Sequence, residues 1–285
     1  MTSIGIVGLG RMGQAMAARF AAQGCAVTGW TRSGRAAEAG QTAPDLATLA
    51  ATADVLVLSL YDDTAVADVL DALLTLPLAG KLVIDTSTVT PEVLQSRAAR
   101  FAEAGAAVVD APISGGPEMV RAGTCGIFLG GADDAAARAR AHLLPLSGAV
   151  HHVGPLGAGL VMKVINNGML QIYFRGLVEL LPLAAQAGLP FETVLTLVAR
   201  GPAGLPMLAA RLPKALGTDT SVGFSVSAVN KDNAVFRKVV AAHGLSSQTL
   251  SAADRHQQQA IAAGLGEADI AAVLRYAYDH RPEEP

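Results

Sequence analysis

The first half of the chain alternates short apolar runs with longer stretches of helical pattern. The apolar runs predict strands at 3–7, 26–30, 54–60, 81–87, 106–112, 125–131 and 150–154. Between most of them lie alanine-rich stretches of helical length, at 11–23, 63–74, 91–104 and 132–143. Strands that alternate with helices in this way predict crossover units on a mainly parallel, doubly wound α/β sheet covered by helices.

After about Gly157 the strand pattern stops. Helical periodicity continues at 158–188, 190–200, 224–243, 246–263 and 267–279, with breaks at Gly and Pro positions. The stretch 158–188 contains no proline except Pro182, so it predicts one long helix, kinked near its end. We therefore expect a nucleotide-binding domain over residues 1–157, joined through this helix to an all-helical domain over residues 158–285.

Composition narrows the class of protein. Hydrophobic residues make up 51% of the 285 positions and charged residues 16%, against roughly 25% charged residues in average proteins. Such a chain can fill a large core and still leave apolar surface for contact between subunits, so we expect a homo-oligomer, a dimer or tetramer. A net charge of −3 without a Lys/Arg-rich block argues against a nucleic-acid or anionic-membrane partner.

The expected location is the cytoplasm. No run reaches the ~18 apolar residues of a membrane span, and the N-terminus lacks the pattern of a signal peptide. Cys25 and Cys125 are the only cysteines, too few for a disulfide framework. His151 and His152 point to opposite faces of a predicted strand, and no other cluster has ligand spacing, so we expect no metal site.

Residues 7–16, VGLGRMGQAM, carry the strongest motif. Three glycines at G-x-G-x-x-G spacing follow a strand-like run and open a helical stretch, as in a Rossmann-type dinucleotide site. There Gly8 permits a tight turn, Gly10 lets the backbone approach a pyrophosphate, and Gly13 lets helix and strand pack closely. A plain tight turn is the alternative. The cofactor contacts expected from this loop are Gly8, Leu9, Gly10, Arg11, Met12 and Gly13.

The end of the second predicted strand bears on the choice of cofactor. A free ribose 2′-OH is usually bound there by Asp or Glu, but the segment GWTRSGR contains neither. Arg32 can pair with a 2′-phosphate, and Thr31 and Ser33 offer hydroxyl groups, so the pattern favours NADP(H) over NAD(H). The alternative is that Arg32 and Arg35 are two solvated arginines in a loop.

A candidate proton donor lies in GPLGAGLVMKVINN, at the start of the long helix. Lys163 and Asn167 are four residues apart and therefore share one face. Desolvation between Met162 and Val164 would lower the pKa of Lys163, so that it could exchange a proton while a nicotinamide exchanges hydride. The spacing alone is equally compatible with a lysine that extends to the surface beside an asparagine bonded to backbone.

Five motifs together resemble one family. GLGRMG, DTSTVTP, DAPISGG, GPLGAGLVMKVINN and VNKDNA occur in the order expected of the β-hydroxyacid dehydrogenases. That family includes 3-hydroxyisobutyrate dehydrogenases, tartronate semialdehyde reductases and glyoxylate/succinic semialdehyde reductases. The closing GLGEAD also matches, so the resemblance covers essentially the whole chain.

The resemblance implies roles for the residues that match. Lys163 matches the catalytic lysine, and Asn167 matches the asparagine that holds the substrate. Ser114, Gly115 and Gly116 match the loop that binds the substrate carboxylate. Lys231 matches a lysine that reaches cofactor and substrate from the helical domain.

Further cofactor contacts follow from the same resemblance. Thr88 matches a contact near the nicotinamide, and Leu60 and Tyr61 are also expected to contact the cofactor. The TRS of residues 31–33 looks like the NRT of NADPH-using members. Residues 117–119 and Tyr61–Asp62 depart from the family pattern, which leaves the substrate preference open.

These residues predict an NADPH-dependent reductase of small aldehyde- or keto-acids, reversible as a 3-hydroxyacid dehydrogenase, with Lys163 as general acid and base. An NADPH-dependent imine reductase or reductive aminase on the same fold is the alternative. Such enzymes resemble this family but usually carry another residue at the position of Lys163 and lack the serine of the SGG loop. A nucleotide-binding module without chemistry is the second alternative.

Overall fold

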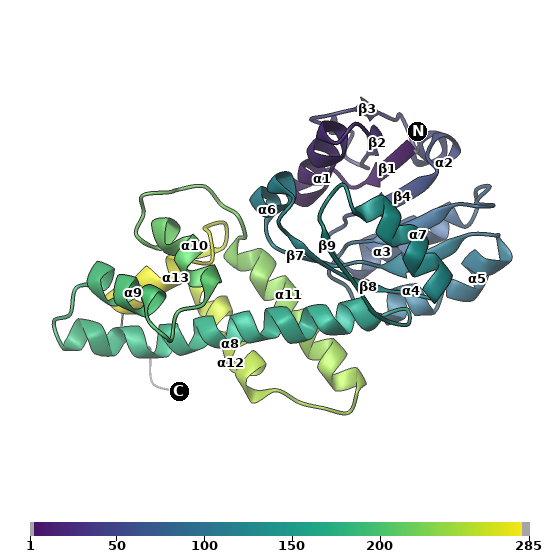
Figure 1. Cartoon of the computed structure of the whole chain (residues 1–285). Helices are drawn as coiled ribbons and strands as arrows, with labels where there is room; N and C mark the ends of the chain where they lie inside the picture. Colours follow the sequence, from purple (N-terminus) through teal and green to yellow (C-terminus); the bar gives the residue numbers. More distant parts are fainter. Residues whose placement is uncertain (1–2, 281–285) are drawn as a thin grey trace. The chain divides into compact units, whose positions relative to one another are not determined.

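The computed structural model describes residues 3–280, in which the chain folds into two compact units. The units divide at the Asn167–Gly168 bond, inside the long helix α8 (Ala158–Gln186). The first unit runs from purple to teal in Figure 1, and the second continues through green to yellow.

One nine-stranded sheet forms the centre of the first unit within the described residues. Six strands run parallel in the order β3-β2-β1-β4-β5-β6, after which β8 pairs antiparallel with β6 and β7 and parallel with β9. The strands are β1 Ser3–Val7, β2 Ala26–Trp30, β3 Gln41–Thr42, β4 Val55–Leu58, β5 Leu82–Asp85, β6 Ala107–Asp110, β7 Ile113–Ser114, β8 Gly126–Gly130 and β9 Ala149–Gly154.

Alternate residues of the central strands pack on opposite faces of this sheet. Val55 and Val57 of β4 join the core cluster under α1, α6 and α7, whereas Leu56 and Leu58 join the cluster under α2 to α5. Burial on both faces explains why these strands read as unbroken apolar runs, and it confirms the doubly wound fold expected from the sequence. The helices are α1 Arg11–Ala22, α2 Leu46–Thr52, α3 Asp63–Leu73, α4 Glu92–Gln95, α5 Ala98–Glu103, α6 Pro117–Ala122 and α7 Asp133–Leu143.

The first unit differs from the predicted elements in detail. The stretch 91–104 holds two short helices, α4 and α5, instead of one. The side chain of Ser96 donates to the carbonyl oxygen of Glu92 between them, a local bond that competes with regular helix. Strands β3 and β7 have two residues each, too few for a period to be visible.

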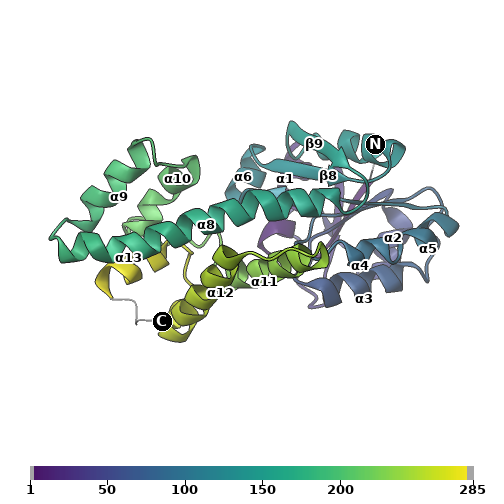
Figure 2. The ribbon, with the colours of Figure 1, turned by 90° about the horizontal axis from the view of Figure 1, so that it is seen from below.

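The second unit is all-helical within the described residues. The single long helix predicted for 158–188 is confirmed as α8, which continues through Pro182. Helix α10 was not predicted, and the helix expected at 267–279 begins only at Ala272. Figure 2 shows α11 and α12 lying side by side. The remaining elements are α9 Phe191–Arg200, α10 Pro206–Ala215, α11 Val226–Ala242, α12 Gln248–Ala260, a π-turn at Ile261–Leu265, and α13 Ala272–Asp279.

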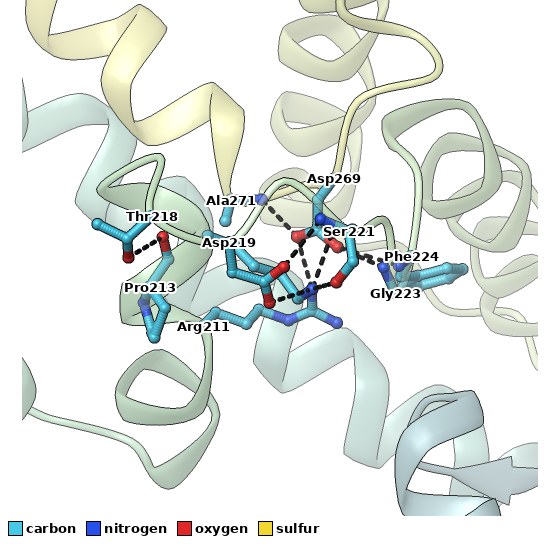
Figure 3. A network of polar contacts seen from close by, with 10 residues as sticks. Arg211, Pro213, Thr218, Asp219, Ser221, Gly223, Phe224, Asp269 and Ala271 are labelled. Atoms are coloured by element: carbon cyan, nitrogen blue, oxygen red, sulfur yellow. Dashed lines mark hydrogen bonds and ion pairs between the residues drawn. The ribbon is translucent and has the colours of Figure 1, made fainter.

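A buried carboxylate joins three segments of this helical unit (Figure 3). Asp269 pairs with Arg211 of α10 at 2.6 Å and accepts hydrogen bonds from the N–H groups of Gly223, Phe224 and Ala271 at 3.0 to 3.1 Å. Burial alone would raise the pKa of Asp269, but Arg211 and the N–H groups outweigh it and lower that pKa below its ordinary value.

No helix within residues 3–280 combines the length and apolarity needed to cross a membrane.

Candidate active site

Except for Lys231, the predicted cofactor residues lie on the loops that leave the parallel strands or in the first turn of α1. Residues 8–13 follow β1, residues 31–33 follow β2, Leu60 and Tyr61 follow β4, and Thr88 follows β5. Because these strands are parallel neighbours, their carboxyl ends meet at one edge of the sheet, which is where ligands bind in such folds. A hydrogen bond of 2.9 Å from the N–H of Leu60 to Ser87 Oγ links two of these loops.

The glycine-rich loop leaves the start of α1 open. Gly8 has a φ of 100°, and a Cβ on Gly13 would overlap the carbonyl oxygen of Gly8, so this turn requires small residues. A Cβ on Gly10 would meet no atom within 4 Å, and no side chain caps the helix. The first turn of α1 therefore combines open space with uncapped N–H groups, which fits a dinucleotide pyrophosphate.

The two arginines of the loop after β2 have different surroundings. Arg32 is 76% exposed and lies 3.8 Å from Asp68 of α3, a weak ion pair at the surface. Arg35 donates to the carbonyl oxygen of Leu9 at 3.4 Å, inside the glycine-rich loop. Both arginines are exposed, but Arg35 is bonded to the glycine-rich loop, whereas Arg32 has only a weak surface partner and could accept a 2′-phosphate.

Lys163 lies at the centre of a polar cluster on the first turns of α8. Its side chain is buried, at 6% exposure, and its Nζ donates to the carbonyl oxygen of Ile113 at 2.5 Å. Asn166 Nδ2 donates to Ser114 Oγ and to Asn167 Oδ1, both at 2.9 Å. The structure therefore brings Lys163, Asn167 and Ser114 together, and Lys163 does not extend to the surface.

Two residues of this cluster were missed by the sequence analysis. Asn166 has the direct bond to Ser114, and its spacing of three from Lys163 could have identified it, because helix positions three and four apart share a face. Asp110, the last residue of β6, accepts hydrogen bonds from the N–H groups of Gly157 at 2.6 Å and Leu160 at 2.8 Å. It belongs to the quoted DAPISGG motif, but nothing local in the sequence indicates this contact.

Lys231 belongs to the helical unit, on α11. Its Nζ lies 2.6 Å from the carboxylate of Asp232, whose side chain is buried. Its contact with cofactor and substrate stays a prediction. Within residues 3–280, no group of three or more His, Cys, Asp or Glu side chains is arranged to hold a metal ion.

Comparison with known proteins identifies the family. Residues 3–154 match the model of the NAD-binding domain of 6-phosphogluconate dehydrogenase, and residues 157–277 match the NAD-binding model of NADP-dependent 3-hydroxyisobutyrate dehydrogenase. The chain belongs to the β-hydroxyacid dehydrogenase family. Both models describe NAD(P)-binding domains, and the protein is an NAD(P)-binding oxidoreductase of the hydroxyacid dehydrogenase type.

Individual relatives cover most or almost all of the chain. The 2-(hydroxymethyl)glutarate dehydrogenase of Eubacterium barkeri is 27% identical over 95% of this chain and 93% of its own length. The NAD-dependent L-serine dehydrogenase of Pseudomonas aeruginosa is 31% identical over 72% of this chain and 71% of its own. The structure of Mycobacterium tuberculosis 3-hydroxyisobutyrate dehydrogenase with L-serine has a TM-score of 0.85, at 28% identity, covering 97% of this chain and 99% of that one.

A reductive aminase shares the fold at lower similarity. The Aspergillus terreus enzyme in complex with NADPH and ethyl levulinate is 22% identical, with a TM-score of 0.64 and coverage of 97% and 99%. At this identity the likeness extends to the fold alone.

Proposed function

We propose that the protein is an NADPH-dependent reductase of small aldehyde- or keto-acids, reversible as a 3-hydroxyacid dehydrogenase. The observation that carries the proposal is the buried side chain of Lys163, whose Nζ donates to the carbonyl oxygen of Ile113, in the same cluster as Ser114, Asn166 and Asn167. A buried cation next to hydrogen-bonding groups is suited to polarise a carbonyl and to deliver a proton to it.

Each residue of the cluster has a chemical task in this proposal. Ser114 Oγ and the N–H groups of Gly115 and Gly116 bind the substrate carboxylate, since Gly115 with a φ of 136° turns the backbone there. Asn167 orients the substrate. Lys163 donates its proton to the carbonyl oxygen during reduction and takes one from the hydroxyl during oxidation. A bound nicotinamide supplies the hydride in reduction and accepts it in oxidation.

The preference for NADP(H) rests on the loop after β2. No acid stands among residues 31–33, and Arg32 reaches solvent with Asp68 as a weak partner. A guanidinium in that position pairs readily with a 2′-phosphate, and NAD(H) offers it no equivalent group. Lys231 contributes a second cation to cofactor and substrate.

The imine reductase alternative is disfavoured by the same cluster. A carboxylate-binding serine and a buried lysine suit an oxo acid, whereas neither is needed for a neutral imine. The test assays the enzyme with NADPH and NADH on glyoxylate, succinic semialdehyde, tartronate semialdehyde and a cyclic imine. We expect turnover of an oxo acid with NADPH; turnover of the imine only would overturn the proposal.

Lys163→Ala tests the chemistry directly. We expect kcat to fall by about 100-fold or more, since general acid catalysis contributes on that order. Lys238→Ala, at an exposed lysine of α11, is the matched control and should leave kcat unchanged. If Lys163→Ala kept kcat within a few-fold of the parent, a binding module or another proton donor would be the better explanation.

We also propose that the protein is a homo-oligomer that associates through α8, with a cytoplasmic location favoured by its two free thiols. Ile165, Met169, Leu180 and Leu183 are 57% to 67% exposed, and their spacing puts them on one side of the helix. An apolar stripe of this kind suits a second copy of the same helix. The double variant Leu180→Glu with Leu183→Glu should lower the mass in light scattering; an unchanged mass would contradict the interface.

A further inference from the structure

We propose that Asp110 is a positioning residue for Lys163: its carboxylate fixes the start of α8 and thereby the place of the ammonium group. This inference rests on the proposed function, because it assigns a purpose to the lysine that the proposal makes the proton donor. Asp110 is bonded to backbone N–H groups of Gly157 and Leu160. It acts through the helix.

Both carboxylate oxygens of Asp110 accept hydrogen bonds from the start of α8. Its side chain has no exposure to solvent, and its two carboxylate oxygens accept from different N–H groups, Gly157 before the helix and Leu160 in its first turn. A helix start leaves such N–H groups without partners inside the helix. Two bonds from one rigid carboxylate fix both the axial position and the rotation of this turn.

The surroundings of the Asp110 carboxylate leave no room for adjustment. A Cβ on Gly159 would overlap the carbonyl oxygen of Phe128 and lie 2.8 Å from Asp110 Oδ2. A Cβ on Gly130 would overlap Asp110 Oδ1. Strand β8, the carboxylate and the first turn of α8 are therefore in direct contact with no side chain between them.

The segment that begins at Asp110 connects this carboxylate with Lys163. The short segment from Asp110 to Ser114 contacts α8 at Leu160, at Lys163 and at Asn166, in that order. These helix residues are three apart and lie on one face. A slip of one residue would move that face by about 1.5 Å and 100° and take the ammonium group away from Ile113. Displacements of about 1 Å at a reacting group cost on the order of 100-fold in rate.

Asparagine cannot replace this carboxylate. Asp110→Asn keeps the shape but has one acceptor oxygen, and its NH₂ group would face an N–H donor. Burial raises the pKa of the Asp110 carboxyl, although the N–H groups of Gly157 and Leu160 oppose the shift. The shape-conserving variant therefore disturbs the helix start while the surrounding fold stays in place.

The experiment compares two aspartates that cap helices. Asp110→Asn is measured beside Asp45→Asn, because Asp45 caps α2 by accepting from the N–H of Thr48 at 2.7 Å, away from the lysine cluster. We expect Asp110→Asn to lower kcat by about 10- to 100-fold, with the Kd for NADPH and the substrate KM within about two-fold of wild type. Asp45→Asn should leave all three unchanged.

A solvent deuterium isotope effect on kcat provides a readout that a purely structural role would not move. It should increase in Asp110→Asn, because a misplaced ammonium group makes proton transfer slower than the other steps. Unchanged kcat in Asp110→Asn overturns the inference. So does a fall in kcat matched by an equal loss of NADPH binding, which would indicate general damage to the fold.

Gly159→Ala gives an independent test that keeps the carboxylate, and it decides the question if Asp110→Asn does not fold. It should lower kcat with NADPH binding retained, while Gly148→Ala, whose Cβ meets nothing within 4 Å, should have no effect. Normal kcat in Gly159→Ala overturns the inference. Lys163→Ala in parallel separates the two proposals: turnover retained there refutes the proposed function, whereas turnover lost there but normal in Asp110→Asn refutes only the role of Asp110.

Discussion

Helices α1 and α8 both begin just after a strand of the same sheet, but the N–H groups of their first turns have opposite surroundings. The start of α1 has only Gly10 as its cap residue, with open space beside it. The start of α8 is closed by the buried carboxylate of Asp110. An open helix start can accept an anion from solution, whereas a closed one is already neutralised and serves as a fixed support.

The helical unit contains a third version of this arrangement. Asp269 accepts from the N–H of Ala271, the residue before α13, but it also pairs with Arg211. The pKa shift is upward for Asp110, which is more deeply buried, and downward for Asp269, where Arg211 and the N–H groups outweigh burial. Two buried carboxylates at helix starts can therefore respond to pH in opposite directions, depending on their burial and on their charge partners.

The largest expected effect comes from removing that cation. Arg211→Met should destabilise the protein by about 3 kcal/mol, because it leaves Asp269 buried with no positive partner from Arg211. Urea unfolding at neutral pH measures this. Arg275→Met removes an exposed ion pair with Asp279 and is the matched control, expected to cost well under about 1 kcal/mol. Equal losses of unfolding free energy in the two variants would contradict the expectation that leaving Asp269 without Arg211 is costly.

The next largest effect should come from making α1 resemble α8. Gly10→Asp would put a carboxylate at the open helix start, so NADPH affinity should fall by about 100-fold through lost charge-assisted hydrogen bonds. The melting temperature should stay level or rise, because Asp is a better helix cap than Gly. Fluorescence titration and thermal unfolding measure the two quantities. Unchanged affinity would mean that this helix start does not contact the pyrophosphate.

Loss of Arg32 should have a smaller effect, confined to one cofactor. Arg32→Ala should raise the KM for NADPH by about ten-fold and that for NADH much less, since only NADPH carries a 2′-phosphate. Steady-state kinetics with both cofactors measures the ratio. Asp68→Asn removes the acid 3.8 Å from Arg32 and should shift the preference toward NADPH by about two-fold. Equal changes with both cofactors would refute the role of Arg32.

The smallest effects should appear in the pH dependence of stability. The pKa of Asp269 is lowered by folding, so its contribution is present above the unfolded value of about 3.9 and is lost as the pH falls through the folded pKa. The pKa of Asp110 is raised, so ionisation above about pH 3.9 reduces stability instead. Urea midpoints of Asp269→Asn and Asp110→Asn from neutral to acidic pH should therefore differ from wild type with opposite slopes. Parallel curves would refute the distinction.

The sequence predicted those parts of the molecule whose cause is local. The central strands could be predicted because both of their faces are buried, which makes them continuous apolar runs. Helix α8 could be predicted because its helical pattern continues past Pro182 without a stop signal. The reversed direction of β8 was not predicted, because an apolar run carries no information on strand direction. Asp110 lies 47 residues before Gly157, so no local pattern connects the carboxylate to the helix that it caps.

The residues of the candidate site also divide into those that the sequence predicted and those that it did not. Lys163, Asn167 and Ser114 came from motifs and helix spacing, and they lie in one cluster. Asn166 was not predicted, because it lies three residues from Lys163 and the predicted pair with Asn167 rests on a spacing of four. The domain boundary at residue 157 and the contact of Lys231 with ligands stay predictions, as does the preference for NADP(H).

The contacts between residues 110–114 and the first turns of α8 also restrict where insertions and deletions can occur in this protein. Deleting or inserting one residue between Leu160 and Asn166 would turn every later side chain by about 100° and separate all the partners beyond it at once. Surface loops in general tolerate changes of length much better. Among descendants of this sequence, length variation should therefore collect in the connecting loops and be purged from these seven positions.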